Sequence, residues 1–348
     1  MKQALTGMSP QQLQAFVRDL GEKPFRARQL FAWIYAKKAQ RFDEMTDMSK
    51  SFRAVLQQQA ALGALRPVEQ SISQRSHTCK YLFSLIDGAL IESVLIRESN
   101  RRTLCISSQA GCALGCKFCA TGAMGFLRNL NAGEIVDQVL TVARELHCEL
   151  TNVVFMGMGE PLLNYDNVIA AAELINHADG IAIGHRHIVI STAGVVPAIQ
   201  RYTGEKQPYR LAISLNSPFQ EEREKLMPVA KKWDIHTLMA AVQVYARKSR
   251  QRPTFEYVMI DGVNMSGNHA AALKKLLKDI PCKVNLIPYN STHSDFKRPG
   301  NIAIRQFAER LAPLSAPVSV RWSKGDDMNA ACGQLAGQRR IVRYEKQE

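Results

Sequence analysis

Short β-rich runs alternate with helical segments over most of the chain, and this alternation restricts the fold more than any other feature of the sequence. The runs lie at 103–107, 152–156, 187–191, 210–215, 255–260 and 284–287, with a further candidate at 318–322. Strands separated by helices pair in parallel through right-handed crossovers. The pattern predicts an α/β protein with about six parallel strands, arranged as a doubly wound sheet or as an open barrel.

The first part of the chain is predicted to be a small helical domain. Ser9 is a candidate N-cap, Pro10 suits the first helical position, and Gly21 ends the segment. A second helix is expected after Pro24 and a third behind Ser49. The basic residues between these helices are either solvated charges or contacts to RNA, and the sequence favours the two interpretations equally.

Two further strands are expected at 81–86 and 90–96. Asp87 and Gly88 join them, and this dipeptide tolerates the positive φ angles of a type I′ hairpin turn. We therefore divide the chain into a helical domain at 1–75, a linking β-hairpin at 76–100 and an α/β domain at 101–348.

The charge balance indicates which partners the protein attracts. Lys and Arg number 45 against 31 Asp and Glu, a formal charge of +14, which favours polyanions and above all nucleic acid. No apolar run approaches the roughly 20 residues of a membrane helix, and the first residues lack the apolar block of a secretory signal. A cytosolic protein without a membrane partner is expected.

The eight cysteines suggest a metal site because four of them are clustered. A disulfide scaffold is not expected, since the cytosol keeps thiols reduced. Three thiols at spacings of four and three can bind one corner of an iron–sulfur cube, or they can form a structural zinc site with a fourth ligand. The clustered thiols are Cys105, Cys112, Cys116 and Cys119, whereas Cys79, Cys148 and Cys282 are expected to be small buried hydrophobes.

Polar and glycine-rich segments follow the predicted strands. Ligands of α/β proteins bind beyond the carboxyl ends of the strands, so these segments are expected to form the site. They lie at 112–119, 157–161, 191–194, 216 and 288–290.

The ordered motifs of the chain resemble a known family. CxxxCxxC after the first predicted strand is similar to the radical S-adenosylmethionine (SAM) enzymes. The segments CISSQAGCALGCKFCATGAMGFLRNL, FMGMGEPLLN, ISTAGVVPAI, LAISLNSP, KLMPV, LIPYN and GDDMNAACGQLAG resemble the RlmN/Cfr family of RNA adenine methyltransferases. The resemblance implies an open, partial βα barrel behind a small N-terminal RNA-binding helical domain.

The resemblance also implies the cofactors and their ligands. A [4Fe–4S] cluster would be bound by Cys112, Cys116 and Cys119, with SAM on the fourth iron. The SAM contacts implied by the family motifs are Gly159, Glu160, Ser191, Ser214, Leu215, Asn216 and Asn290. Asn216 departs from the His that many members carry, which puts this one contact in doubt.

Three further residues match the reacting groups of the family. Cys332 corresponds to the cysteine that is itself methylated, Cys105 to the thiol that resolves a covalent intermediate, and Glu92 to the proton acceptor. One SAM would methylate Cys332, and a second would be cleaved to a radical that activates this methyl group for addition to adenine. Two SAM molecules are thus implied per turnover, and the two cysteines end as a disulfide.

The implied reaction is methylation of carbon 2 of an adenosine in 23S rRNA, at the peptidyl transferase centre. Methylation of carbon 8 of the same adenosine, as in Cfr, is the first alternative. A zinc-stabilised RNA-binding protein without catalysis is the second. The sequence leaves open whether transfer RNA is another substrate and which reducing protein donates electrons, and a monomer is expected.

Overall fold

One large sheet organises the protein. The computed structural model describes residues 2–146, 149–249, 251–292, 294–322 and 324–336, so Cys148 lies outside the described residues. The strands of this sheet are β3 (Leu65–Ile72), β4 (Cys79–Leu85), β5 (Leu90–Glu98), β6 (Arg101–Cys105), β9 (Asn152–Phe155), β10 (Ile188–Thr192), β11 (Arg210–Ser214), β12 (Thr254–Met259), β13 (Lys283–Pro288) and β14 (Val318–Val320). Their order is β14-β13-β12-β11-β10-β9-β6-β5-β4-β3.

The pairing within the sheet confirms the expected α/β class. Strands β6 and β9 to β14 pair in parallel, and all six predicted runs and the candidate at 318–322 fall on these strands. Strands β3 to β6 pair in antiparallel fashion. Since β14 and β3 lie at opposite ends of the strand order and do not pair, the sheet is open, as expected for a partial barrel.

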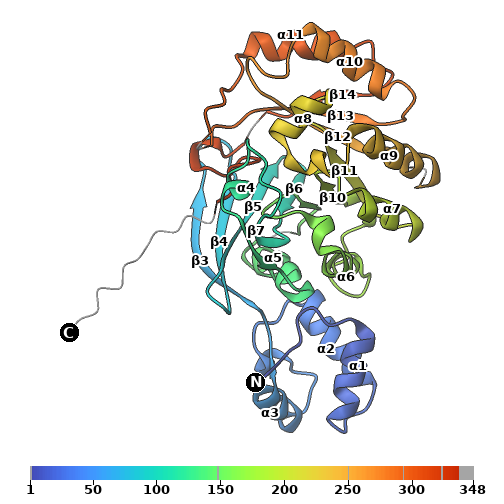
Figure 1. Ribbon diagram of the computed structural model, residues 1–348. Helices are drawn as coiled ribbons and strands as arrows, with labels where there is room; N and C mark the ends of the chain where they lie inside the picture. The colour runs from blue at the N-terminus through green and yellow to red at the C-terminus, as the bar shows by residue number, and fades with distance from the viewer. Residues whose placement is uncertain (1, 147–148, 250, 293, 323, 337–348) are drawn as a thin grey trace.

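Helices follow the parallel strands and complete the α/β units. They are α5 (Ala132–Glu145), α6 (Tyr165–Asn176), α7 (Val196–Gly204), α8 (Gln220–Leu226), α9 (Ile235–Ser249), α10 (Gly267–Leu277) and α11 (Asn301–Leu311). Figure 1 shows α10 and α11 at one end of the molecule and the N-terminal helices at the other. No helix in the described part of the chain is long and apolar enough to cross a membrane.

The N-terminal helices form where the sequence predicts them. They are α1 (Pro10–Asp19), α2 (Phe25–Phe31) and α3 (Lys50–Gln59). Ser9 caps α1 in a capping box with Gln12, and Ser49 caps α3. Two short parallel strands, β1 (Gln3–Ala4) and β2 (Ala60–Ala61), close this domain.

The expected hairpin is part of a larger antiparallel unit. Strand β3 pairs along its length with β4, so the sheet and not the helical domain contains residues 65–72, and the expected boundary at residue 75 falls beyond this strand. The reason is that β3 is a mostly exposed edge strand, LRPVEQSI, whose polar and apolar residues do not alternate in the way that predicts strands.

The helical domain is fixed to the sheet domain by close backbone contacts. A Cβ at Gly7 would lie 2.5 Å from the Gly133 nitrogen, and Gly7 has a φ of +99°. Asp137 on α5 accepts hydrogen bonds from the Ala64 and Leu65 amides at 2.7 and 3.0 Å. The two domains therefore pack as one unit along the start of α5.

We predict that Gly7→Ala destabilises the protein more than Gly21→Ala does. Both glycines have a positive φ, which costs an alanine about 1 kcal/mol, but only Gly7 has backbone within 4 Å of the added Cβ. The difference between the two free energies of unfolding, measured in urea, isolates the interdomain contact. Equal losses would show that backbone strain alone is responsible.

Candidate active site beyond the strand ends

The cysteine motif lies on the loop that follows β6. It begins after the short strand β7 (Gln109–Gly111), which pairs with β8 (Phe126–Asn129). Gly111 is required there, because it has a φ of +75° and a Cβ would lie 2.0 Å from the Gly125 oxygen. The Cys112 amide donates to the same oxygen at 2.8 Å. The β7–β8 pair thus holds both ends of the loop that carries the thiols.

The three thiols are half-buried and influence one another. Burial raises the pKa of Cys112 to about 11, and burial together with the nearby Cys119 and Cys112 raises the pKa of Cys116 further. Neutral thiols result unless a cation stabilises the thiolates. This donor set suits iron, which binds thiolates readily.

The cysteine thiols do not surround a single metal position. Among the described residues, no group of three or more His, Cys, Asp or Glu side chains converges on one point that could hold a metal ion. Convergence is not needed in a four-iron cube, because each thiolate binds a different iron. The residues present therefore fit a cluster by their chemistry and by their position on a single loop.

Gly159 and Glu160 lie in the loop after β9. Gly159 has a φ of +99°, and a Cβ there would lie 2.5 Å from the Cβ of Gln109, so only glycine fits. The Glu160 carboxylate accepts from the Leu162 and Ala193 amides at 3.0 and 2.7 Å. Burial raises the pKa of Glu160 to about 7, which these hydrogen bonds oppose. A buried carboxylate of this kind is suited to binding a cationic ligand.

Ser191 and Ser214 lie on one face of the sheet. Ser191 pairs with Ala212, and Ser214, two residues further along β11, pairs with Glu256. Because side chains alternate along strands and paired residues share a face, both serines point to the side of Glu256. Leu215, the next residue, is fully buried in the core.

Asn216 has a structural role in this geometry. It is buried with a φ of +61°, and its side-chain oxygen accepts from the Val258 amide at 2.8 Å. Its side-chain nitrogen contacts the Met227 sulfur at 3.1 Å. The predicted contact to a cofactor therefore competes with hydrogen bonds that tie two strand ends together.

The segment that carries Cys332 packs against the cysteine loop. The Ala120 amide donates to the Gly333 carbonyl at 2.7 Å, and the Thr121 hydroxyl donates to the Leu335 carbonyl. The Asn290 side chain donates to the Cys332 carbonyl at 3.1 Å. Residues far apart in the sequence thus meet beside α4 (Ala120–Ala123).

Cys105 and Cys332 interact electrostatically. Cys105 is buried, and burial and then Cys332 raise its pKa to about 12. The Cys332 side chain is exposed, although the surrounding protein still raises its pKa; Arg321 lowers it, and Glu256 and Cys119 raise it. The structure therefore brings the cysteine loop, Cys332 and Cys105 into one region.

Two charged residues of this region were not predicted from the sequence. Glu256 is buried in β12, where Asn285 donates to its Oε1 at 2.9 Å and its Oε2 has no partner among the described residues. Arg321 follows β14 and interacts electrostatically with Cys332 and Glu256. A carboxylate inside the apolar run TFEYVM is the signal that could have indicated Glu256.

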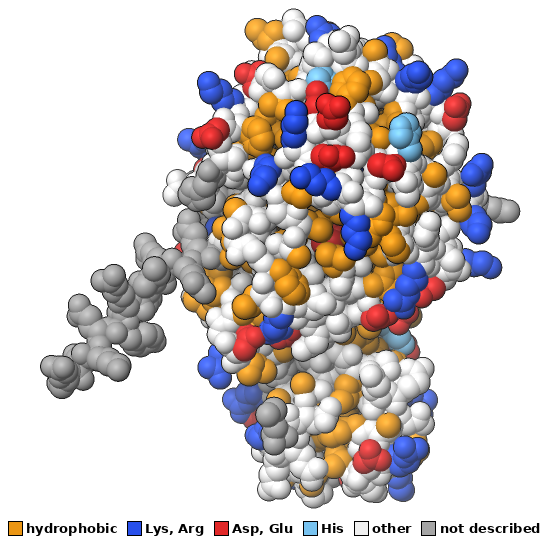
Figure 2. Space-filling view, viewed as in Figure 1, with side chains coloured by type: hydrophobic (Ala, Val, Ile, Leu, Met, Phe, Trp, Pro, Cys, Tyr) orange, Lys and Arg blue, Asp and Glu red, His pale blue; other side chains and the backbone are white. Residues whose placement is uncertain are grey.

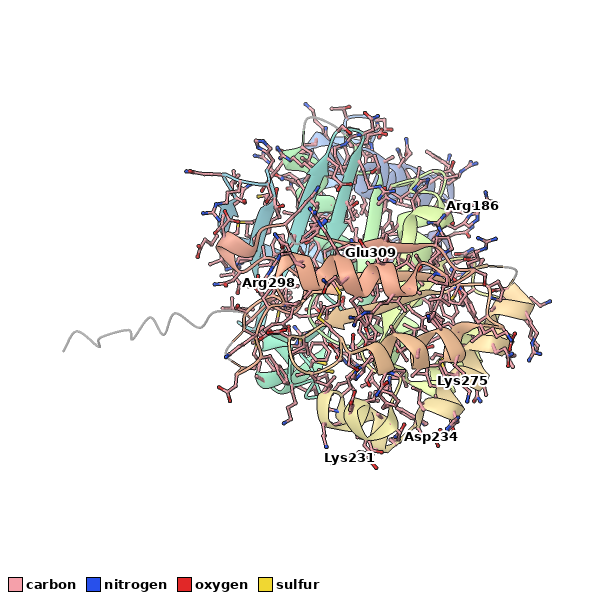
Figure 3. All side chains as sticks on the ribbon, turned by 90° about the horizontal axis from the view of Figure 1, so that it is seen from above. Arg186, Lys231, Asp234, Lys275, Arg298 and Glu309 are labelled. Carbon is pink, nitrogen blue, oxygen red and sulfur yellow. The ribbon has the colours of Figure 1, made fainter. Side chains whose placement is uncertain are left out.

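Buried Arg223 holds the loops around the cysteines. It donates to the Ala193 and Leu215 carbonyls at 2.6 and 3.2 Å. Arg298, which Figure 3 shows near the beginning of α11, donates to Asn290 at 3.1 Å. Guanidinium groups therefore stabilise the loops after β10, β11 and β13.

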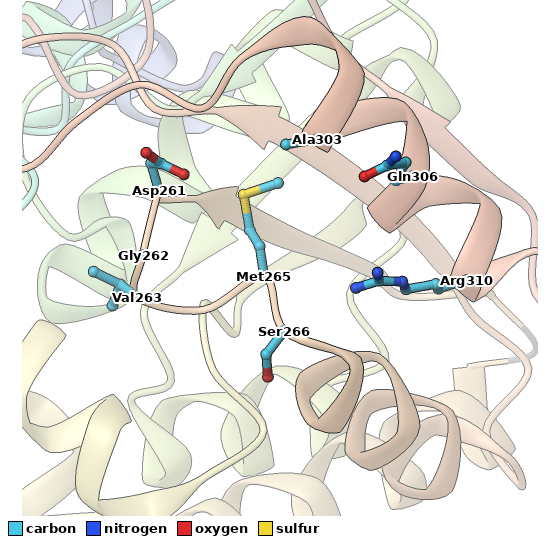
Figure 4. A pocket seen from close by; sticks show the side chains of 8 residues that line it. All are labelled: Asp261, Gly262, Val263, Met265, Ser266, Ala303, Gln306 and Arg310. Atoms are coloured by element: carbon cyan, nitrogen blue, oxygen red, sulfur yellow. The ribbon is translucent and has the colours of Figure 1, made fainter.

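A separate pocket of about 300 Å³ lies between the loop after β12 and α11. Figure 4 shows Asp261 and Arg310 on opposite sides of it. None of the predicted site residues lines this pocket, so it is distinct from the cysteine region.

Comparisons with known proteins agree with this arrangement. The family model of the ribosomal RNA large subunit methyltransferase N-terminal domain matches residues 3–62, and that of the radical SAM superfamily matches residues 106–273. A probable dual-specificity RNA methyltransferase RlmN of Symbiobacterium thermophilum is 43% identical over 338 residues, covering 96% of this chain and 91% of that protein. The dual-specificity RNA methyltransferase RlmN of Syntrophobacter fumaroxidans is 45% identical, covering 94% and 96%.

A solved structure has the same fold. The crystal structure of a radical SAM methyltransferase from Sphaerobacter thermophilus superposes with a TM-score of 0.93 at 41% identity, covering 97% of this chain and 100% of that chain.

We predict that the cofactor-free protein loses stability as the pH rises from about 5 to about 7, partly because of Glu160. The pKa of Glu160 is about 7 in the folded state against an ordinary value of 4.5, so the folded state binds more protons in this range. The loss for this residue is about 3 kcal/mol. Thermal unfolding of Glu160→Gln between pH 5 and 8 should show a flatter dependence, whereas the exposed Glu173→Gln should behave like the wild type.

Proposed function

Because this chain belongs to the RlmN family of radical SAM RNA methyltransferases, we propose that it methylates carbon 2 of an adenosine in 23S rRNA through a methyl group carried on Cys332. The observation that carries this proposal is the packing of the Cys332 segment against the cysteine loop, with Cys105 beside it. Such a carrier is needed because carbon 2 is electrophilic and cannot attack a sulfonium methyl group. The names of the relatives include dual specificity, which supports transfer RNA as a second substrate.

The radical SAM family implies a [4Fe–4S] cluster and SAM. Cys112, Cys116 and Cys119 would hold the cluster, which with SAM supplies the methyl group and the one-electron chemistry. Gly159 lets the backbone approach the methionine end of SAM, and the Glu160 carboxylate suits its ammonium group. Ser191 and Ser214 on the Glu256 face and Asn290 beside Cys332 complete the proposed contacts, with Leu215 and Asn216 shaping the loop between them.

The three remaining residues each act in a later step of the reaction. Cys332 is exposed, so both SAM and the RNA base can reach its sulfur. Glu92 accepts the proton from the ring carbon after the base is bonded to Cys332. The Cys105 thiolate then attacks the Cys332 sulfur and forms a disulfide. The bond from that sulfur to the transferred carbon breaks, its electron pair stays on this carbon, and the carbon takes up a proton to become the methyl group. A reducing protein restores the two thiols and supplies electrons to the cluster.

The N-terminal domain is proposed to contact RNA. Its matching family model belongs to ribosomal RNA methyltransferases. Figure 2 shows Lys and Arg side chains distributed over the visible face of both domains, mixed with acidic ones. The Lys37 Nζ lies 3.6 Å from the centre of the Trp33 ring. An aromatic ring and a cation are thus adjacent on this domain, a combination suited to contacting bases and phosphates.

Mass spectrometry of ribosomal RNA tests the proposed reaction. Cells that lack the gene should gain a carbon-2 methyl group on one adenosine when they express the wild type, and none when they express Cys116→Ala. The purified Cys116→Ala protein should also lack cluster iron, since it loses one of three ligands.

Cys282→Ala is the matched control, because Cys282 is a buried thiol outside the site and should leave iron content and methylation unchanged. A methyl group on carbon 8 would establish the Cfr reaction instead. A colourless zinc protein without RNA methylation would overturn the enzymatic assignment.

Cys105→Ala and Cys332→Ala are predicted to stop at different steps. Cys105→Ala still carries a methyl group on Cys332 and adds it to the base, but it cannot release the product, so the protein accumulates covalently bound RNA. Cys332→Ala has no carrier sulfur and forms no adduct. Gel mobility after nuclease digestion measures the adduct, and its appearance in Cys332→Ala would contradict these roles.

A further inference from the structure

A buried ion pair joins β4 and β5, the two strands that precede the strand of Cys105 in the sheet. Lys80 on β4 places its Nζ 3.2 Å from Oε1 of Glu92 on β5. The exposed fractions of the two side chains are 14% and 3%, so solvent screens this pair weakly. One carboxylate oxygen of Glu92 is thus bound by a side chain from the neighbouring strand.

The register of the strands places this pair on the face of Cys105. Lys80 is opposite Val94, and Val94 is opposite Cys105. Glu92, two residues before Val94, shares the same face because side chains alternate along a strand. Ser93 points the other way and donates to Gln138 on α5 at 2.7 Å.

The second oxygen of Glu92 is unoccupied. Oε2 is buried and has no hydrogen-bond partner among the residues that the structure describes. The backbone of Ala336, in the segment after Cys332, interacts with the carboxyl group as a hydrogen-bond donor and lowers its pKa. A buried carboxylate oxygen without a partner is costly, which indicates that it is kept for a bound group.

The groups around Glu92 have opposing effects on its pKa. Burial raises its pKa to about 7, Lys80 from β4 and the Ala336 amide oppose this effect, and Glu69 from β3 adds to it. Lys80 is the one cation among these groups. Without it, the pKa of Glu92 would be higher, and less of the carboxylate would be ionised at neutral pH to accept a proton.

We propose that Lys80 is a positioning residue for RNA methylation: it anchors Glu92 through Oε1 and favours its ionised form, so that Oε2 takes the proton of the ring carbon. In this step the ring carbon–hydrogen bond breaks, the proton moves to Oε2, and the electron pair remains in the base. The inference rests on the function proposed above.

Lys80→Met tests this role, with Lys80→Arg as the matched variant that retains the charge. At pH 7, Lys80→Met should release the base from its covalent adduct about fivefold more slowly, as expected for a rise of one unit from a pKa of about 7 for Glu92. The rate should recover as the pH rises to about 9, where Glu92 ionises without Lys80. Lys80→Arg should follow the wild-type pH profile.

Infrared difference spectra of the holoenzyme against Glu92→Gln provide a readout without RNA. A protonated carboxyl band at pH 7.5 is expected to be stronger in Lys80→Met than in the wild type. Equal bands, or a loss of rate that is the same at every pH, would overturn the proposal. Methylation of Cys332 and iron content should be unchanged in Lys80→Met, and failure of wild-type RNA methylation would instead count against the proposed function.

Discussion

The contact between the Cys332 segment and the cysteine loop is the interaction on which the proposed site depends. The Ala120 amide reaches the Gly333 carbonyl at 2.7 Å. Gly333 has a φ of +84°, and a Cβ there would lie 3.2 Å from the Phe118 carbonyl, so the two segments approach closely. This contact holds the exposed Cys332 beside the loop that carries the other thiols.

Buried charge is the second constraint on this region. Arg223, Glu160, Glu256 and Glu92 are all nearly inaccessible, and each is held by backbone groups, a side-chain amide or an opposite charge. Such groups are costly in an apolar core, and they are tolerated when hydrogen bonds satisfy them. The open barrel supplies these partners because the loops beyond its strands converge at one end.

Local signals explain what could be predicted from the sequence. The Ser9 cap, the hairpin turn at Asp87 and the cysteine spacing are short-range patterns, and the parallel strands follow from their alternation with helices. Pairing between strands is not revealed by a single sequence. The edge strand β3 and the ion pair of Lys80 with Glu92 both depend on such pairing. The hydrogen bond of the Asn216 side chain with Val258 could not be predicted for the same reason, since it joins the loop after β11 to strand β12.

The edge strand β3 also helps to prevent self-association of the protein. An open sheet leaves an unpaired row of backbone groups along β3, a template onto which a strand of another molecule could add. Pro67 removes one donor from that row, and an irregular register between Pro67 and Glu69 bends the strand. The outermost strand therefore combines proline, charge and a bulge, the features by which open sheets resist aggregation in a crowded cell.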